Sequence, residues 1–288
     1  MKIAYLITAF NNYNHLEKLI NSLNDENSIF FIHIDKKSEM PQNINTEENI
    51  IFINRHTVWW GGWSHQLAIL NLMNEAVKHN LDYYSLISGA DYPIRPKKFL
   101  TNKLQEGGEF ISLIKGAELD ERASRTKYYY FDYFDRRNRK NLKTQLFIIF
   151  EKALRGLLVK NTRPFKQIYH GPTWWTLSHN AIIYILEFLE ENKEYIKFFK
   201  SSFCAEESLI HTIIGNSEFK ENCKYYLTYT EWSNKSGPNN INLEHLILFE
   251  NQLEFEVVEG KYTPYFARKF NDQNSDLISI IDNKLRNA

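Results

Sequence analysis

The sequence predicts an α/β protein built on a mainly parallel, doubly wound sheet that is flanked by helices. Short runs rich in β-branched and aromatic residues alternate with segments that carry apolar residues at helical spacing, which is the pattern of strand–helix–strand units. Hydrophobic residues make up 43% of the 288 residues and aromatic residues 15%, enough to bury a sizeable core. Length and composition therefore agree with the alternating pattern.

Five strands and two helices are predicted in the first 115 residues. Each strand is a run of mostly β-branched or aromatic residues bounded by polar ones, and the five runs are 2–8, 29–35, 50–53, 83–88 and 109–114. The first helix covers 16–23, where leucine and isoleucine recur on one face. The second covers 63–78 and has Ser64 near its start.

Polar residues follow several of these strands. Ligands of doubly wound sheets bind beyond the carboxyl ends of the strands, so the residues there are candidates for a site. We expect His33 to be a buried histidine with a structural role, and Asp91 to cap its own Gly-x-Asp-Tyr-Pro turn. The candidates at the strand ends are Thr8, His33, Asp35, Lys36, Lys37, Ser88 and Asp91.

The pattern loosens after residue 115. Residues 121–143 are charged and aromatic, and residues 146–159 form a predicted apolar helix. Between Arg136 and Lys166 there are ten basic residues and one acidic residue, Glu151. Two interpretations of this helix remain open: it lies on an anionic membrane surface, or it is a core helix with a solvated basic collar.

The remaining third of the chain returns to an alternating pattern. The segment 170–178 leads into a helix with apolar residues from 182 to 189, and 225–230 is a predicted strand. Residues 234–242 form a loop by their Ser, Gly, Pro and Asn content. An apolar and basic stretch, 265–270, precedes a C-terminal helix. We find no repeats and no domain linker, so we expect one domain over 1–288.

Charge and cysteine content exclude several classes of protein. Lys and Arg number 35, as do Asp and Glu, so no overall charge favours nucleic acid as a partner. The two cysteines, Cys204 and Cys223, do not make a disulfide framework and favour a reducing compartment. No run approaches the length of a membrane span, and the start reads as a buried strand rather than a signal peptide. We therefore expect a cytoplasmic protein.

The stretch 201–214 holds two adjacent carboxylates, Glu206 and Glu207, just before apolar residues at helical spacing. We expect one helix whose first turn carries both carboxylates to the edge of a cleft. The helix dipole would then keep them ionised, which suits a group that must accept a proton. Acidic residues in a first helical turn also occur for this dipole reason alone.

Six segments in the same order resemble the core-2/I-branching enzyme family, which contains β-1,6-N-acetylglucosaminyltransferases, peptide xylosyltransferases and bacterial relatives. Together they span residues 2–270, and the ordered set is more specific than any one segment. The six segments are HIDKKS (33–38), VWWGGWSHQLAILNLM (58–73), LISGADYPIRP (86–96), GPTWWTLSHNAIIYIL (171–186), CAEESLIHTII (204–214) and YFARKF (265–270).

The resemblance implies a glycosyltransferase-A fold and an inverting reaction that needs no metal, which agrees with the lack of an Asp-x-Asp motif. It places Glu207 on the catalytic base, Lys269 on a diphosphate-binding lysine and Asp35 on a nucleotide contact. Thr8 and Asp91, at the strand ends, would also border the nucleotide and its diphosphate. Residues that would contact the acceptor are Trp174 and Trp232, whose rings suit stacking on a sugar, Arg122, Arg125, Lys127 and, as an orienting neighbour of the base, Glu206.

The sequence departs from the family pattern at several positions. Glu206 replaces an Asp, Ala205 a Pro, and Pro172 the Ser of Gly-Ser. The family's second diphosphate-binding cation should fall near 237–240, where no basic residue occurs. The nearest substitutes are Lys235 and Arg268.

These features predict an enzyme that transfers a sugar from a UDP-sugar to a glycan hydroxyl in surface polysaccharide synthesis. N-acetylglucosamine is the sugar that we expect most. Residues 1–115 would form the nucleotide-binding half and residues 116–288 the acceptor-binding and catalytic half. Lipid-linked acceptors and peripheral contact with the inner face of the plasma membrane would fit the basic helix. Alternatives are a UDP-xylose-dependent transferase, a metal-dependent transferase and an inactive protein that binds a glycan or nucleotide.

Overall fold

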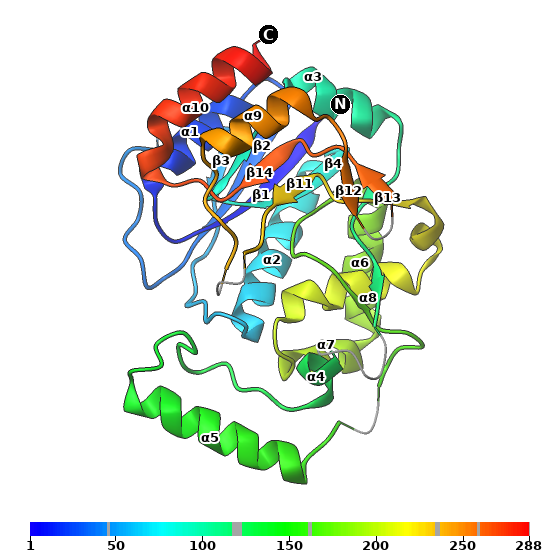
Figure 1. Cartoon of the computed structure of the whole chain (residues 1–288). Coiled ribbons are helices and arrows are strands. Elements are labelled where there is room, and N and C mark those ends of the chain that lie inside the picture. Colours follow the sequence, from blue (N-terminus) through cyan, green and yellow to red (C-terminus); the bar gives the residue numbers. More distant parts are fainter. Residues whose placement is uncertain (45–46, 117–122, 161–162, 234–236, 258–259, 288) are drawn as a thin grey trace.

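The computed structural model describes residues 1–44, 47–116, 123–160, 163–233, 237–257 and 260–287 (Figure 1). Its centre is a seven-stranded mixed sheet in which most neighbours run parallel. β9 is antiparallel to both of its neighbours, β4 and β6. The predicted α/β class with a mainly parallel sheet is therefore confirmed. In spatial order the strands are β10 (Cys223–Lys224), β6 (Glu109–Phe110), β9 (Trp175–Ser178), β4 (Tyr83–Ser88), β1 (Ile3–Ala9), β2 (Ser28–Ile34) and β3 (Ile50–Phe52).

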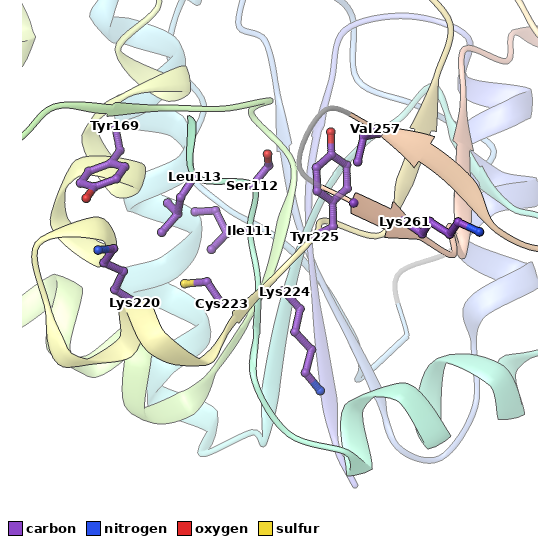
Figure 2. Close-up of a pocket in the computed structure, with 11 residues that line it drawn as sticks. Ile111, Ser112, Leu113, Tyr169, Lys220, Cys223, Lys224, Tyr225, Val257 and Lys261 are labelled. Atoms are coloured by element: carbon purple, nitrogen blue, oxygen red, sulfur yellow. The ribbon is translucent and has the colours of Figure 1, made fainter. Parts of the chain in front are cut away.

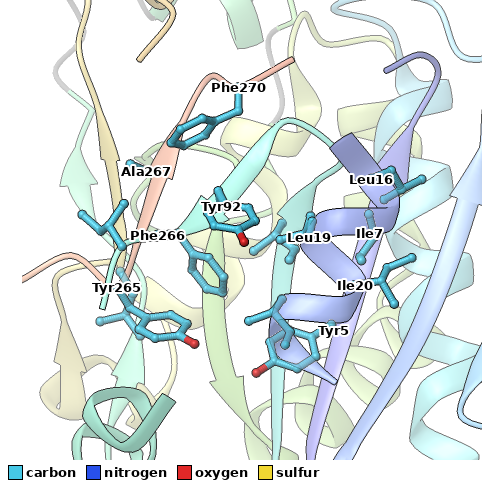
Figure 3. Packing of buried hydrophobic residues seen from close by; sticks show 14 of the residues in the cluster. Tyr5, Ile7, Leu16, Leu19, Ile20, Tyr92, Tyr265, Phe266, Ala267 and Phe270 are labelled. Carbon is cyan, nitrogen blue, oxygen red and sulfur yellow. The ribbon is translucent and has the colours of Figure 1, made fainter. Parts of the chain in front are cut away.

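Helices cover both faces of this sheet, because alternate residues of the central strand enter two different cores. Ile3, Tyr5 and Ile7 of β1 pack in one core, and Ala4 and Leu6 pack in the other. Figure 3 shows the apolar face of α1 packed against Tyr5 and Ile7. The first core takes α1 (Tyr13–Leu23), α3 (Lys97–Gln105), α9 (Leu243–Asn251) and α10 (Ser275–Ile281); the second takes α2 (Trp63–Ala76), α6 (His179–Glu191), α7 (Lys193–Lys200) and α8 (Leu209–Gly215).

Smaller sheets lie beside the main one. A three-stranded sheet joins β11 (Thr228–Thr230), β14 (Phe266–Arg268) and β5 (Asp91–Pro93), and its register sets Arg268 opposite Asp91. This pairing brings the 265–270 segment against the turn that follows β4. Two further pairs are β7 (Ile114–Lys115) with β8 (Tyr169–His170), and β12 (Phe255–Val257) with β13 (Gly260–Tyr262).

Several predicted boundaries were wrong. The predicted strand 109–114 is two short strands, β6 and β7, with residues 111–113 between them. The predicted strand 225–230 shortens to β11. The second helix ends at Ala76 and continues as a 3₁₀ turn, Val77–His79.

The helix predicted at 146–159 is α5 (Leu142–Leu157), which begins earlier than expected because the Asn141 side chain caps it by accepting the Lys143 N–H at 2.8 Å. A short helix, α4 (Ala123–Lys127), precedes it. Figure 1 shows α5 and α4 at the end of the molecule that lies away from α10 and the main sheet. Cys204 and Cys223 are both free.

Candidate active site

The ends of β1, β2 and β4 meet at one edge of the sheet, as parallel strands should. Thr8 is in register with His33 on one side and with Ser88 on the other. Asp35 continues from β2 and donates its N–H to the carbonyl of Ala9 at 2.9 Å. The predicted strand-end candidates are therefore neighbours in space.

The Asp35 carboxylate holds the HIDKKS turn together. Its Oδ1 accepts the N–H of Lys37 at 3.0 Å and that of Val58 at 3.3 Å, and its Oδ2 pairs with Lys37 Nζ at 2.8 Å. The same ammonium lies 4.5 Å from the centre of the Trp59 ring. Asp35 thus fixes the loop that borders the strand ends.

His33 is buried and structural in its contacts, as expected. Its Nε2 accepts the N–H of His56 at 3.2 Å. Burial lowers the pKa of His33 to about 4, and the neighbouring His56 ring adds to this effect. The imidazole is therefore neutral near pH 7 and serves as a hydrogen-bond acceptor.

Asp91 caps its own turn and pairs with Arg268 inside the protein. One carboxylate oxygen accepts the N–H of Ser88, and the other lies 3.3 Å from Arg268 Nε. Burial raises the pKa of Asp91, and Arg268 opposes this rise. The Arg268 guanidinium also lies 4.2 Å from the centre of the Trp174 ring. Only 12% of the Arg268 side chain is exposed, and its guanidinium covers a ring face of Trp174.

Lys269 differs from Arg268 because no described carboxylate lies within ion-pair distance of its ammonium. Its backbone is fixed: its N–H donates to the Asn239 carbonyl at 3.2 Å, and its carbonyl accepts the Ile241 N–H at 2.9 Å. Burial lowers the pKa of Lys269, and the positive charge of Arg268 lowers it further. An anion bound at this position would stabilise the ammonium.

Glu206 and Glu207 lie in a 3₁₀ turn, Ala205–Glu207, and not in the first turn of the following helix. The prediction of one continuous helix was wrong, because Ser208 adopts a non-helical conformation and separates the turn from α8. The Glu207 carboxylate instead forms an ion pair with Arg125 of α4, and both side chains are about one-third exposed, at 32% and 29%. Burial would lower the pKa of Arg125, but the Glu207 charge raises it overall.

Glu206 turns the other way, into the protein. Its Oε1 lies 3.3 Å from Nδ1 of His65, and its buried Oε2 has no hydrogen-bond partner among the described residues. His65 is not among the residues predicted from the sequence, although it follows the Trp-Ser pair of a family segment. Glu206 therefore acts as a fixed neighbour of Glu207.

Asp132 is a second residue that sequence reasoning missed. Its carboxylate accepts the Ser64 N–H at 2.5 Å and the Ser64 hydroxyl at 3.0 Å. A side chain at Gly62 would overlap the Asp132 carboxylate. Asp132 thus binds the start of α2. Among the described residues, no group of three His, Cys, Asp or Glu side chains is placed to hold a metal ion.

Residues 171–174 run from the Glu207 turn to the Arg268 side chain. The Gly171 N–H donates to the Glu207 carbonyl at 3.0 Å, and Trp174, three residues later, lies under Arg268. A Cβ on Gly171 would overlap the carbonyl of Ser112, so this close approach needs glycine. The predicted base Glu207 and the predicted cation Arg268 thus border the same short segment.

The predicted acceptor residues are distributed unevenly. Trp232 is 67% exposed and pairs with Pro238, so its ring is available for stacking, whereas Trp174 is only 7% exposed. Lys127 is exposed and its ammonium lies 5.8 Å from the Tyr128 ring. Arg122 and Lys235 lie outside the described residues.

A shallow hollow of about 310 Å³ opens beside the site, at the edge formed by β6 and β10 (Figure 2). Lys220 points toward Tyr169 there, while Lys224 and Lys261 point away from the centre. Ser112 lines the hollow, and its carbonyl also lies against Gly171 of the site. Its lining residues are Ile111, Ser112, Leu113, Tyr169, Lys220, Cys223, Lys224, Tyr225, Val257, Gly260 and Lys261.

The chain is similar to known proteins over nearly its whole length. The sequence profile of the core-2/I-branching enzymes matches residues 3–248. The chain is 25% identical to xylosyltransferase sqv-6 of Caenorhabditis briggsae and of Caenorhabditis elegans, over 97% of this chain and 36% of each relative. It is 22% identical to xylosyltransferase 2 of Rattus norvegicus, over 98% of this chain and 33% of the relative. The chain thus spans about a third of the length of these relatives. No helix among the described residues has the length and apolarity needed to cross a membrane.

Proposed function

Because this chain belongs to the core-2/I-branching enzyme family, and is thus a glycosyltransferase, we propose that it transfers a sugar with inversion from a UDP-sugar to a glycan hydroxyl. Enzymes of this family act without a metal ion. We propose that Glu207 takes the proton of the acceptor hydroxyl. The acceptor oxygen then forms a bond to C1 of the donor sugar, while the C1–O bond to the diphosphate breaks and UDP leaves with the electron pair.

The observation that carries this proposal is the position of Glu207. Its carboxylate is partly exposed, its backbone is tied to Gly171, and the segment that starts there ends under Arg268. A base and a leaving-group cation must flank the reacting carbon, and residues 171–174 would line the space between them. Arg125 orients the carboxylate before the acceptor binds. We propose that the acceptor hydroxyl then takes over part of this contact.

Lys269 is the main cation for the departing diphosphate in this proposal. Arg268 already neutralises Asp91, so its positive charge is largely committed within the protein. Lys269 has no such partner among the described residues, and its lowered pKa would recover when phosphate oxygens approach. Lys235 remains a proposed second cation.

The other proposed contacts follow from the strand ends and the exposed rings. Thr8, Asp35 and Asp91 would border the nucleotide and its diphosphate, where β1, β2 and β4 end together. Trp232 would stack on the acceptor, because its ring is exposed. Arg122, Arg125 and Lys127 would contact the acceptor's polar groups, with Glu206 behind the base. We propose that Trp174 mainly supports Arg268 and contacts the acceptor only with the edge of its ring.

The donor sugar has two candidates. N-acetylglucosamine is the first, from the resemblance of the six segments to the N-acetylglucosaminyltransferases. Xylose is the second, because the curated relatives described above are named as xylosyltransferases. A screen of UDP-sugars for hydrolysis and thermal stabilisation, run in EDTA, would separate them. Stabilisation only after a divalent metal is added would contradict the metal-independent proposal.

The decisive variant is Glu207→Gln, which keeps the shape of the side chain but cannot accept the proton. We expect turnover to fall by about 10² to 10⁴, the usual contribution of a general base, while UDP affinity stays unchanged. Glu190→Gln, on the exposed side of α6, is the matched control and should keep full activity. Unchanged transfer by Glu207→Gln would remove this residue as the base. No transfer by the wild-type protein with any UDP-sugar would favour an inactive binding protein.

The cellular setting is proposed from the resemblance to bacterial relatives. We propose a single catalytic domain, with residues 1–115 as its nucleotide half and 116–288 as its acceptor half. It would work in the cytoplasm on surface polysaccharide, whose growing chains are carried on lipids. Deletion of the gene should then remove one sugar from a surface glycan, and an unchanged glycan would contradict this setting.

A further inference from the structure

Within the described part of the chain, the contacts of helix α5 with the rest of the protein lie along one side. Glu151, on its inner side, is buried and accepts a hydrogen bond from Arg136 Nη1 at 2.6 Å. The ring of Phe147 stacks on that of Phe134 with their centres 5.0 Å apart. Thr144 is also buried on this side. These contacts fix the orientation of the helix. The side of α5 opposite to them therefore faces outward.

The outward side of α5 is apolar. Residues 142, 146, 149 and 157 recur at the spacing of one helical face, and each is more than 60% exposed. Exposed single leucines are common on proteins, but a stripe along the whole length of one helix marks an interaction surface. We call this the outer stripe of α5: Leu142 (74% exposed), Leu146 (66%), Ile149 (63%) and Leu157 (80%).

The exposed charged residues between 136 and 160, on and beside the outer stripe, are all basic. Lys143 and Lys152 are exposed and flank it on either side, and Lys140 lies just before the helix. The one acidic residue between 136 and 160 is Glu151, which is buried and paired with Arg136. The core-helix interpretation is therefore wrong, because the leucine and isoleucine side chains of the outer stripe are exposed.

We propose that the outer stripe of α5 docks the protein onto an anionic lipid surface, with the helix lying in the plane of the interface. Apolar side chains would enter the boundary between headgroups and acyl chains, while the flanking lysines contact lipid phosphates. A second copy of the chain is a poorer occupant, because two such faces would bring lysines against lysines. An anionic membrane satisfies both the apolar stripe and its charged border.

Docking at this helix would bring the proposed active site close to the lipid headgroups. The Arg136 guanidinium, which binds Glu151 of α5, lies 5.6 Å from the Phe203 ring. The Arg125 guanidinium, which binds Glu207, lies 6.0 Å from the same ring. The Phe203 ring is thus contacted both by Arg136, which binds the docking helix, and by Arg125, which binds the proposed base. This part of the inference rests on the proposed function and fits an acceptor carried on a lipid.

Vesicle flotation tests the proposal without any need for activity. We expect the wild-type protein to float with vesicles of equal parts phosphatidylcholine and phosphatidylglycerol, and not with phosphatidylcholine alone. Leu146→Ser with Ile149→Ser should weaken binding at least tenfold. Replacing Lys140, Lys143 and Lys152 by Gln should weaken vesicle binding by on the order of a hundredfold at low salt. The reason is that each basic residue near an anionic lipid surface contributes a similar share of the binding free energy.

The matched control is Leu243→Ser with Ile247→Ser on α9, where the two side chains are 59% and 58% exposed. This variant should float like the wild type. All of the variants should keep the wild-type circular dichroism and thermal midpoint, because the substituted side chains are exposed. They should also keep wild-type transfer to a water-soluble acceptor, which separates failure of docking from failure of the proposed function.

Three outcomes would overturn the proposal. The first is a wild-type protein that does not float with phosphatidylglycerol vesicles. The second is equal loss of binding in the α5 and α9 variants. The third is a dimer, measured by light scattering, that Leu146→Ser with Ile149→Ser abolishes, since this would assign the outer stripe to a second copy of the chain.

Discussion

Removing the charge of Asp91 would leave the buried Arg268 guanidinium against Trp174 without a counter-charge. Asp91 Oδ1 lies 3.3 Å from Arg268 Nε, close enough for strong attraction although the two atoms are not aligned as a hydrogen bond. At an effective dielectric constant of about 20, two unit charges at this distance attract each other by about 5 kcal/mol. Buried pairs that lose one partner cost about 3–5 kcal/mol. We expect Asp91→Asn to lower the free energy of unfolding by about 3 kcal/mol, even though the amide can still accept the Ser88 N–H.

The reverse variant, Arg268→Met, should behave differently with pH. Methionine keeps an apolar chain over Trp174 but leaves the Asp91 carboxylate alone. Burial already raises the pKa of Asp91, and the loss of Arg268 raises it further. A folded-state pKa above the unfolded value means that the folded protein binds the extra proton, so the variant gains stability as the pH falls. Its deficit relative to the wild type should therefore shrink between about pH 8 and about pH 5.

Urea unfolding of both single variants and the double variant measures this coupling. Circular dichroism is the suitable signal, because Trp174 fluorescence changes when Arg268 is replaced. Asp276→Asn, on the exposed side of α10, is the control for the loss of one negative charge. The double variant should be more stable than the sum of the two single losses predicts. Additive losses, or a deficit of Arg268→Met that is the same at both pH values, would refute the reasoning.

Three further predictions concern other parts of the structure. Gly171→Ala should lower turnover at least tenfold and also lower the thermal midpoint, because its Cβ would overlap the Ser112 carbonyl; wild-type kinetics would contradict this. Glu151→Gln should lower the free energy of unfolding by about 3 kcal/mol by stranding Arg136, and should expose α5 to limited proteolysis, whereas an unchanged digestion pattern would count against it. Burial also lowers the pKa of three histidines. Below about pH 6.5 the unfolded state therefore binds about one more proton at each of them, and the stability of the folded state should fall as the pH drops toward 4. A thermal midpoint that stays constant over this range would disprove this prediction. The three are His15 (pKa about 4), His33 (about 4) and His211 (about 3).

The sequence by itself determined the fold class and the order of most elements. Alternation of apolar residues within a strand and their recurrence along a helix are local properties, and they survive folding because each element keeps its own period. The turn at Asp91 and the buried state of His33 could be predicted for the same reason. The six ordered segments also indicated the family, since each retains its residues in a fixed local spacing.

Only the tertiary structure decided which residues are partners. Arg268 meets Asp91 because β14 pairs with β5. Glu207 meets Arg125 because the Arg125 carbonyl of α4 accepts the N–H of Phe203, just before the 3₁₀ turn. Neither pairing follows from local spacing. The register between strands and the face of a helix that is covered depend on contacts between segments far apart in the chain. For this reason the sequence could supply the apolar and basic residues of α5, but not the direction in which its outer stripe points.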